Sequence, residues 1–204
     1  MLDEERWNQL VKRLTGNPPA EGSFSRIIAA YSEDHRYYHT FGHIKHCLSE
    51  FDEVKVLMDV PDELESAIWL HDIVYDTHAP DNEEKSAEFA KGLLSETACP
   101  ELKVRKIQDL ILITKHIRQP ETPDAQLIVD IDLTILGYPP EIYNVYEKNI
   151  RKEYSWVSAE DYKIGRTKVL QSFLNRPSIY NTSSFKRIYE RQARENIITA
   201  LGRL

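Results

Sequence analysis

Imidazole and carboxylate side chains gather at three separate places in this chain: the dipeptide His71-Asp72, residues 38–43, and residues 130–132. Such groups are borderline to hard ligands that suit divalent transition metals. His71 continues the apolar stripe of the predicted helix over residues 64–71, so it should point inward. Because burying polar groups costs free energy unless something compensates, the pattern predicts a metal site assembled from several helices.

Helical phasing separates the two aspartates of the third place. Successive residues on a helix lie about 100° apart, so Asp130 and Asp132 cannot face the same way. Asp132 shares an arc with Ile128 and Ile135, whereas Asp130 projects toward the other side. We therefore expect Asp132 to be the carboxylate that reaches the metal.

The two histidines of residues 38–43 also differ. His39 and His43 are four residues apart, which on a helix would place one above the other. His43 neighbours Cys47 at the edge of an apolar arc and can reach the core, whereas His39 falls where the helix begins. We expect His43 to bind the metal and His39 to lie near it without touching it.

These residues must be positioned by helices, because apolar residues recur at helical spacing almost throughout and alternating strands are not evident. The sequence predicts an all-α, single-domain helical bundle over residues 1–204, with a metal-binding core at about 24–137 and C-terminal helices at about 139–204 that complete it. A loop is expected between Tyr75 and Asp81. The helices are expected over residues 7–14, 24–31, 44–54, 64–71, 82–94, 104–117, 125–136, 140–154, 159–173 and 184–201.

Composition restricts the partners and the compartment. The net charge of −7, from 26 basic and 33 acidic residues, disfavours polymeric nucleic acid. No stretch approaches the roughly 20 apolar residues of a membrane span, and the N-terminus is acidic where a secretory signal would be basic. Cys47 and Cys99 lie in separate segments without a motif around them, so we expect a reducing, cytoplasmic compartment. Whether the chain forms a homo-oligomer stays open.

The ordered set His43, His71-Asp72 and Asp132 on separate helices resembles the signature of the HD superfamily of metal-dependent phosphohydrolases. The resemblance extends to a bacterial-type branch of about this length and covers most of the chain. It implies an all-helical bundle in which His43, His71, Asp72 and Asp132 coordinate a divalent cation, with Mn, Mg, Ni, Zn and Fe as candidates. The matching segments are residues 38–44, 69–76, 82–87, 130–137, 150–154 and 193–196.

The resemblance also suggests catalytic roles. Residues 38–43 are similar to those of cyclic-nucleotide phosphodiesterases, in which the earlier histidine protonates the leaving oxygen, so His39 is the candidate general acid. The expected reaction is hydrolysis of a phosphate mono- or diester of a small substrate, a nucleotide among the candidates, by a metal-activated water. Glu83, and after it Asp76, are the carboxylates expected to order that water.

Basic side chains are candidates for binding the substrate phosphate, because guanidinium groups match phosphate oxygens and ammonium groups supply charge. Arg166 is the strongest candidate, because it lies on an apolar arc between Tyr162 and Leu170. A structural ion pair with an internal carboxylate would leave the same pattern. The candidates are Lys85, Lys115, Arg151, Arg166 and Arg194.

Other interpretations remain open at this level. An isolated inward histidine is more often a hydrogen-bonded core residue than a ligand. A diiron oxygenase on the same scaffold would need further histidines, and only His116 stands at a suitable place, although helical phasing puts it opposite Ile107 and Ile111. A metal-binding or nucleotide-binding signalling module without turnover is the third alternative.

Overall fold

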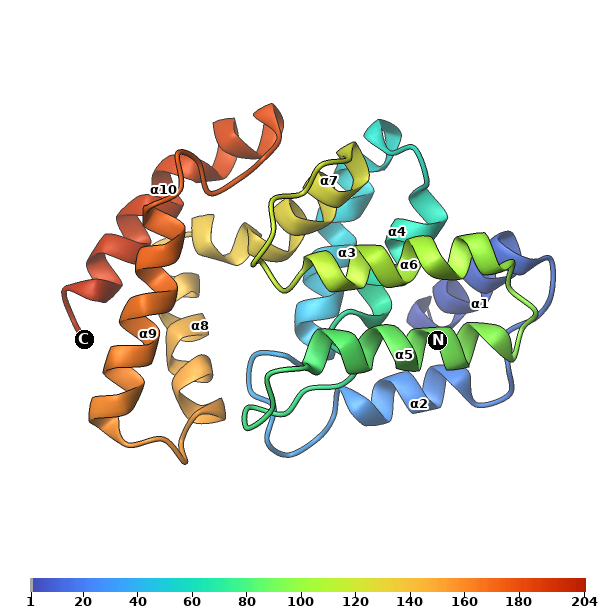
Figure 1. Ribbon diagram of the computed structural model, residues 1–204, viewed down its shortest axis with the longest axis horizontal. Helices are drawn as coiled ribbons and strands as arrows, with labels where there is room; N and C mark the ends of the chain where they lie inside the picture. Colours follow the sequence, from blue (N-terminus) through green and yellow to red (C-terminus); the bar gives the residue numbers. More distant parts are fainter. Residues whose placement is uncertain (1) are drawn as a thin grey trace. The chain divides into compact units, whose positions relative to one another are not determined.

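The computed structural model describes residues 2–204, apart from the side chain of Leu2. Within these residues it contains ten α-helices, two short 3-10 helices and no strand (Figure 1). The all-α expectation is therefore confirmed. The chain divides into two compact units, Met1–Ile128 and Val129–Leu204, and the single-domain organisation stays a prediction. The division falls inside α7 (Pro123–Asp132), so this helix begins in the first unit.

The first unit is built around α4 (Pro61–Leu70), whose residues from Glu63 to Leu70 are all buried. Helix α4 packs against α1, α3, α5 and α6, and Figure 1 shows α5 and α6 running side by side. Because neighbouring helices cover α4, the residue that follows it, His71, is also held in the core. The other helices of the unit are α1 (Leu2–Thr15), α2 (Ser23–Ala30), α3 (Phe41–Val54), η1 (Lys55–Leu57), α5 (Asn82–Ser95) and α6 (Glu101–Ile113).

Two buried carboxylates fix α4 in place. Glu65, 1% exposed, accepts hydrogen bonds from Arg6 at 2.6 Å and Arg13 at 3.0 Å, both on α1. Asp124 on α7 accepts hydrogen bonds from the backbone amides of Asp59 and Val60, just before the helix begins. Such donors at a helix start have no partner within the helix, so Asp124 takes the place of a local cap.

The second unit consists of the end of α7, η2 (Leu133–Gly137), α8 (Pro140–Glu153), α9 (Ala159–Leu174) and α10 (Ser183–Leu201). Helix α10 packs against η2, α8 and α9. At Gly137 a Cβ atom would lie 2.6 Å from Cβ of Tyr189, so only glycine allows this close approach. The Ser158 hydroxyl accepts a hydrogen bond from the Asp161 amide and caps α9.

Two predicted helices end earlier than expected. Helix α6 stops at Ile113 instead of residue 117, where the Thr114 hydroxyl bonds the Ile111 carbonyl. Helix α7 stops at Asp132 and continues as η2, where the Thr134 hydroxyl bonds the Ile131 carbonyl. Threonine side chains that bond nearby carbonyls compete with the helical pattern, which apolar spacing does not reveal. None of the described helices is long and apolar enough to span a membrane.

Candidate metal centre

Two buried histidines from different helices of the first unit meet in its core. His43 lies in the first turn of α3, where Thr40 caps the helix by accepting a hydrogen bond from the Gly42 amide. His71 follows the last residue of α4 directly and is 2% exposed. The Nε2 atoms of the two imidazoles are 3.2 Å apart. The sequence therefore predicted correctly that both side chains point inward.

Asp72 brings a carboxylate oxygen to the same point. Its Oδ2 atom lies 3.0 Å from Nε2 of His71 and 3.5 Å from Nε2 of His43. Ligand atoms about 2.1 Å from a shared cation lie about 3.0 Å apart in octahedral and about 3.4 Å apart in tetrahedral coordination. The three interatomic distances therefore suit a shared divalent cation.

The protonation of His71 supports this fit. Nδ1 of His71 lies 3.0 Å from the carbonyl oxygen of Ile68, which can only accept a hydrogen bond, so Nδ1 carries the proton. Nε2 of a neutral His71 then presents a lone pair to the Asp72 oxygen. Two acceptors at this distance repel one another unless a cation or a second proton lies between them. Metal-binding histidines commonly donate their other ring N–H to a carbonyl in this way.

The charge state of Asp72 fits the same arrangement. In the chain without a cation, a second proton on Nε2 of His71 is what relieves this repulsion. Burial by itself raises the pKa of the Asp72 carboxyl group, but the charge and hydrogen bond of His71 in this protonated form, together with His39 and His43, outweigh burial and lower the pKa below its usual value. Asp72 is therefore an ionised carboxylate, the form that binds a metal.

Asp132 is the last residue of α7. It belongs to the second unit, whereas His43, His71 and Asp72 belong to the first. Its place as the fourth ligand stays a prediction. The sequence predicted all four residues as ligands.

Helical phasing predicted that Asp132 faces inward and that Asp130 does not, but Asp132 is only half-buried. Asp130 is the more deeply buried of the two. It is fully buried, and its oxygens accept hydrogen bonds from the backbone amides and side chains of Asn181 and Thr182, at 2.6 to 2.9 Å. These contacts hold the chain where it enters α10. Burial raises the pKa of Asp130 despite the four donors. Asp130 is therefore part of the scaffold of the second unit.

His39 precedes α3, so it does not lie one helical turn before His43. Its ring stacks on Tyr75 with centroids 4.1 Å apart and an interplanar angle of 28°. The centroids of His39 and His43 are 6.0 Å apart. His39 is half-buried, beside the buried histidine pair. His39 therefore lies close to the candidate ligands, and its role as proton donor stays a prediction.

The two carboxylates expected to order water differ in their surroundings. Glu83 lies in the first turn of α5, and its side chain is 25% exposed and 3.6 Å from Nζ of Lys115. Asp76 is more than half exposed and accepts hydrogen bonds from the backbone amide and Nδ1 of His78 within the loop before α5. Asp76 therefore stabilises a turn, and Glu83 is the better candidate of the two.

The two lysines expected to bind phosphate are paired with carboxylates. Lys85 lies 2.7 Å from Asp81, one helical turn earlier. Lys115 lies 2.6 Å from Glu84 and donates a hydrogen bond to the Pro80 carbonyl. Lys115 thus ties the end of the loop over residues 75–81 to α5.

The three arginines hold the second unit together. Arg166 is buried and forms a bidentate ion pair with Glu147, which is the structural alternative that the sequence left open. Arg194 binds Glu190 and the carbonyls of Leu174 and Arg176. Arg151 donates hydrogen bonds to the carbonyls of Tyr154 and Val157.

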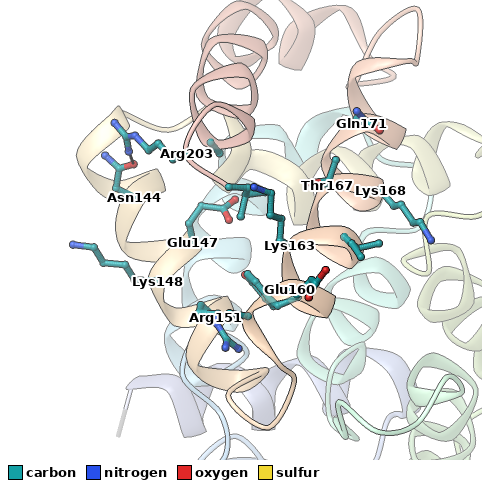
Figure 2. Close-up of a pocket in the computed structure, with 15 residues that line it drawn as sticks. Asn144, Glu147, Lys148, Arg151, Glu160, Lys163, Thr167, Lys168, Gln171 and Arg203 are labelled. Carbon is teal, nitrogen blue, oxygen red and sulfur yellow. Dashed lines mark hydrogen bonds between the residues drawn. The ribbon is translucent and has the colours of Figure 1, made fainter.

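A groove of about 1250 Å³ lies between α8 and α9 in the second unit (Figure 2). Its lining includes Arg151, Lys148, Lys163 and Lys168, and Figure 2 shows these side chains along both helices. None of the four predicted metal ligands lines this groove. Of the predicted phosphate-binding residues, Arg151 alone belongs to its lining.

Sequence reasoning misplaced His116 and missed two residues. His116 lies beyond the end of α6 with a φ of 58°, so helical phasing does not describe it. Arg36 and Tyr75 both contact the segment that carries His39, but neither was singled out. The available signal was their proximity in sequence to His39 and to His71-Asp72.

Comparison of the chain with protein-family models, with curated proteins and with solved structures gave no match in any of the three. The residues of the site and their geometry are therefore the basis for assigning a function.

Proposed function

We propose that this protein is an HD-type, metal-dependent phosphohydrolase that cleaves a phosphate mono- or diester of a small substrate. The observation that carries the proposal is the convergence of His43, His71 and Asp72, whose ligand atoms lie 3.0 to 3.5 Å apart in the core. Asp132 is the fourth ligand of the set predicted from the sequence. Imidazole and carboxylate donors together suit a first-row divalent cation.

His43, His71, Asp72 and Asp132 would hold the cation. When bound, a divalent cation supplies Lewis-acid activation of water and of a phosphoryl oxygen. The carbonyl of Ile68 keeps the proton of His71 on Nδ1, so that Nε2 stays available as a ligand. The buried surroundings strengthen every charge interaction with an anionic substrate at this point.

His39 would donate the proton to the leaving oxygen. Its ring is held by stacking on Tyr75, and its centroid lies 6.0 Å from that of His43. A general acid must reach the leaving group while the ligands stay on the cation, which this separation allows. Glu83, anchored by Lys115, is the candidate for ordering the attacking water.

The arginine contacts change how substrate charge would be balanced. Arg166 and Arg194 are committed to Glu147 and Glu190, and Lys85 to Asp81. Releasing them for phosphate would break an existing ion pair. We therefore propose that the cation carries most of the charge neutralisation, which favours a substrate with a single phosphate group.

A substrate screen tests this proposal. The chain is loaded with Mn²⁺ and assayed with p-nitrophenyl phosphate, bis-p-nitrophenyl phosphate and nucleotides. We expect turnover that His71→Ala abolishes and that His78→Ala, a change at an exposed loop histidine, leaves intact. Metal-loaded protein that hydrolyses no phosphoester while it binds a nucleotide tightly would overturn the proposal in favour of a signalling module. Metal analysis of the chain as purified, before it is loaded with Mn²⁺, tests the oxygenase alternative. Two irons per chain with visible absorbance would favour it.

A further inference from the structure

Arg36 is a buried cation in the segment between α2 and α3. Its side chain is 0% exposed, and Nε donates a hydrogen bond at 2.9 Å to Glu33, whose side chain is 45% exposed. Burying a guanidinium costs free energy unless its N–H groups find acceptors. The fold therefore has to satisfy this group at a particular place in the core.

Backbone carbonyls from two distant segments provide the other acceptors. Nη1 donates to the carbonyls of His39 at 3.1 Å and Asp72 at 2.6 Å, and Nη2 donates to the carbonyl of Ile73 at 3.0 Å. One planar guanidinium thus connects His39, the predicted proton donor, with the dipeptide His71-Asp72, which is predicted to bind the metal. Only arginine presents several donors in a fixed fork of this kind.

Two aromatic rings reinforce the same connection. The guanidinium lies 5.2 Å from the ring centroid of Tyr31 and 5.4 Å from that of Tyr75, within the range of cation–π attraction. The Tyr75 ring is also the one on which His39 stacks. Arg36 therefore contacts both the backbone of His39 and the ring that orients its imidazole.

The carbonyls of Asp72 and Ile73 lie just beyond the end of α4, which closes at Leu70. The helix dipole favours a cation close to a helix C-terminus. Arg36 thus holds the turn that follows the helix leading to His71.

We propose that Arg36 is a positioning residue that binds the carbonyls of His39, Asp72 and Ile73 together and so fixes the proton donor relative to the metal ligands. The consequence for catalysis rests on the proposed function. The mechanical role of Arg36 does not, because it depends only on contacts within the first unit.

Hydrogen exchange of the full-length chain tests the mechanical role. Arg36→Lys keeps the charge but cannot bind three carbonyls as a fork, and Arg26→Lys, at an exposed ion pair with Glu96, is the matched control. We expect amides in residues 37–43 and 71–76 to exchange at least about tenfold faster in Arg36→Lys, the effect of losing one hydrogen bond to a charged group. Exchange in residues 101–113 should be unchanged. Unchanged exchange in both segments, or equal acceleration in all three, would overturn the inference.

Affinity for Mn²⁺, measured by calorimetry, gives a readout separate from turnover. We expect Arg36→Lys to weaken binding about tenfold or more. Tyr75→Leu leaves the carbonyl contacts of Arg36 intact, so it should lower kcat with little change in Mn²⁺ affinity. Wild-type Mn²⁺ affinity in Arg36→Lys would contradict the inference. A chain that binds Mn²⁺ without hydrolysing any ester would instead refute the proposed function alone.

If Arg36→Lys does not fold, Glu33→Ala decides the question, because it removes the acceptor of Arg36 Nε at an exposed side chain. The inference then predicts faster exchange in residues 37–43 and 71–76 with residues 101–113 unchanged, and unchanged exchange in both segments would overturn it.

Discussion

Oδ2 of Asp72 lies 3.0 Å from Nε2 of His71, although the two residues are neighbours in the chain. Within a continuous helix, neighbouring side chains diverge by about 100°. The two meet here because α4 ends at Leu70 and the chain turns, with the Ile73 amide bonded to the Leu70 carbonyl. A dipeptide at a helix end can therefore supply two ligand atoms to one point.

His39→Gln should separate proton donation from metal binding. Because His39 is not among the candidate ligands, we expect Mn²⁺ affinity to change by less than about threefold, while kcat falls about 100-fold or more. The limb of the pH–rate profile that reports the general acid should also disappear. Steady-state kinetics across pH and calorimetry measure these effects.

The control for this change is His78→Gln, at an exposed histidine of the following loop. This control variant should change neither the affinity for Mn²⁺ nor kcat. An unchanged kcat in His39→Gln, in a chain that His71→Ala inactivates, would remove His39 from the mechanism.

Arg166→Lys should destabilise the protein. Arg166 is buried, binds Glu147 through two hydrogen bonds and donates a third to the Tyr146 hydroxyl, a pattern that lysine cannot reproduce. We expect the free energy of unfolding in urea to fall by about 2 kcal/mol or more.

Arg191→Lys, at an exposed pair with Glu195, should change the free energy of unfolding by less than about 0.5 kcal/mol. Unaltered stability in Arg166→Lys together with a raised KM would instead favour the role in phosphate binding that the sequence suggested.

Glu190 should make the stability of the protein depend on pH. Burial by itself raises the pKa of Glu190, but the amides of Ile179 and Tyr180, the Ser178 hydroxyl and Arg194 outweigh it and lower the pKa below 4.5. A carboxyl group that is more acidic in the folded chain stabilises the fold above its unfolded pKa, and this contribution is lost as pH falls through the lowered value.

We therefore expect Glu190→Gln to cost about 1 to 2 kcal/mol of unfolding free energy near pH 7, and this difference from the wild type to shrink below pH 4.5. Urea unfolding at a series of pH values measures it, with the exposed Glu195→Gln as control. A difference that grows as pH falls would contradict the assignment.

The helical fold and the inward direction of the key side chains were predictable because both follow from local periodicity. The stripe of α4 leads to His71. Phasing separated Asp130 from Asp132 but did not indicate that Asp130 is the more deeply buried, against Asn181 and Thr182. The residue with which each buried polar side chain pairs could not be predicted from periodicity. Phasing placed Arg166 on an inner face, but nothing local indicates that Glu147 lies opposite. Arg36 was missed because its acceptors are backbone carbonyls, which leave no trace in residue types.

The metal content of the purified chain tests the central claim most directly. After treatment with a chelator, reconstitution with Mn²⁺ and removal of excess metal, mass spectrometry should find about one divalent cation per chain in the wild type and in His78→Ala. His71→Ala should retain none above background. A wild-type chain without metal, or full occupancy in His71→Ala, would contradict the assignment and leave His71 and Asp72 as a buried ion pair of the core.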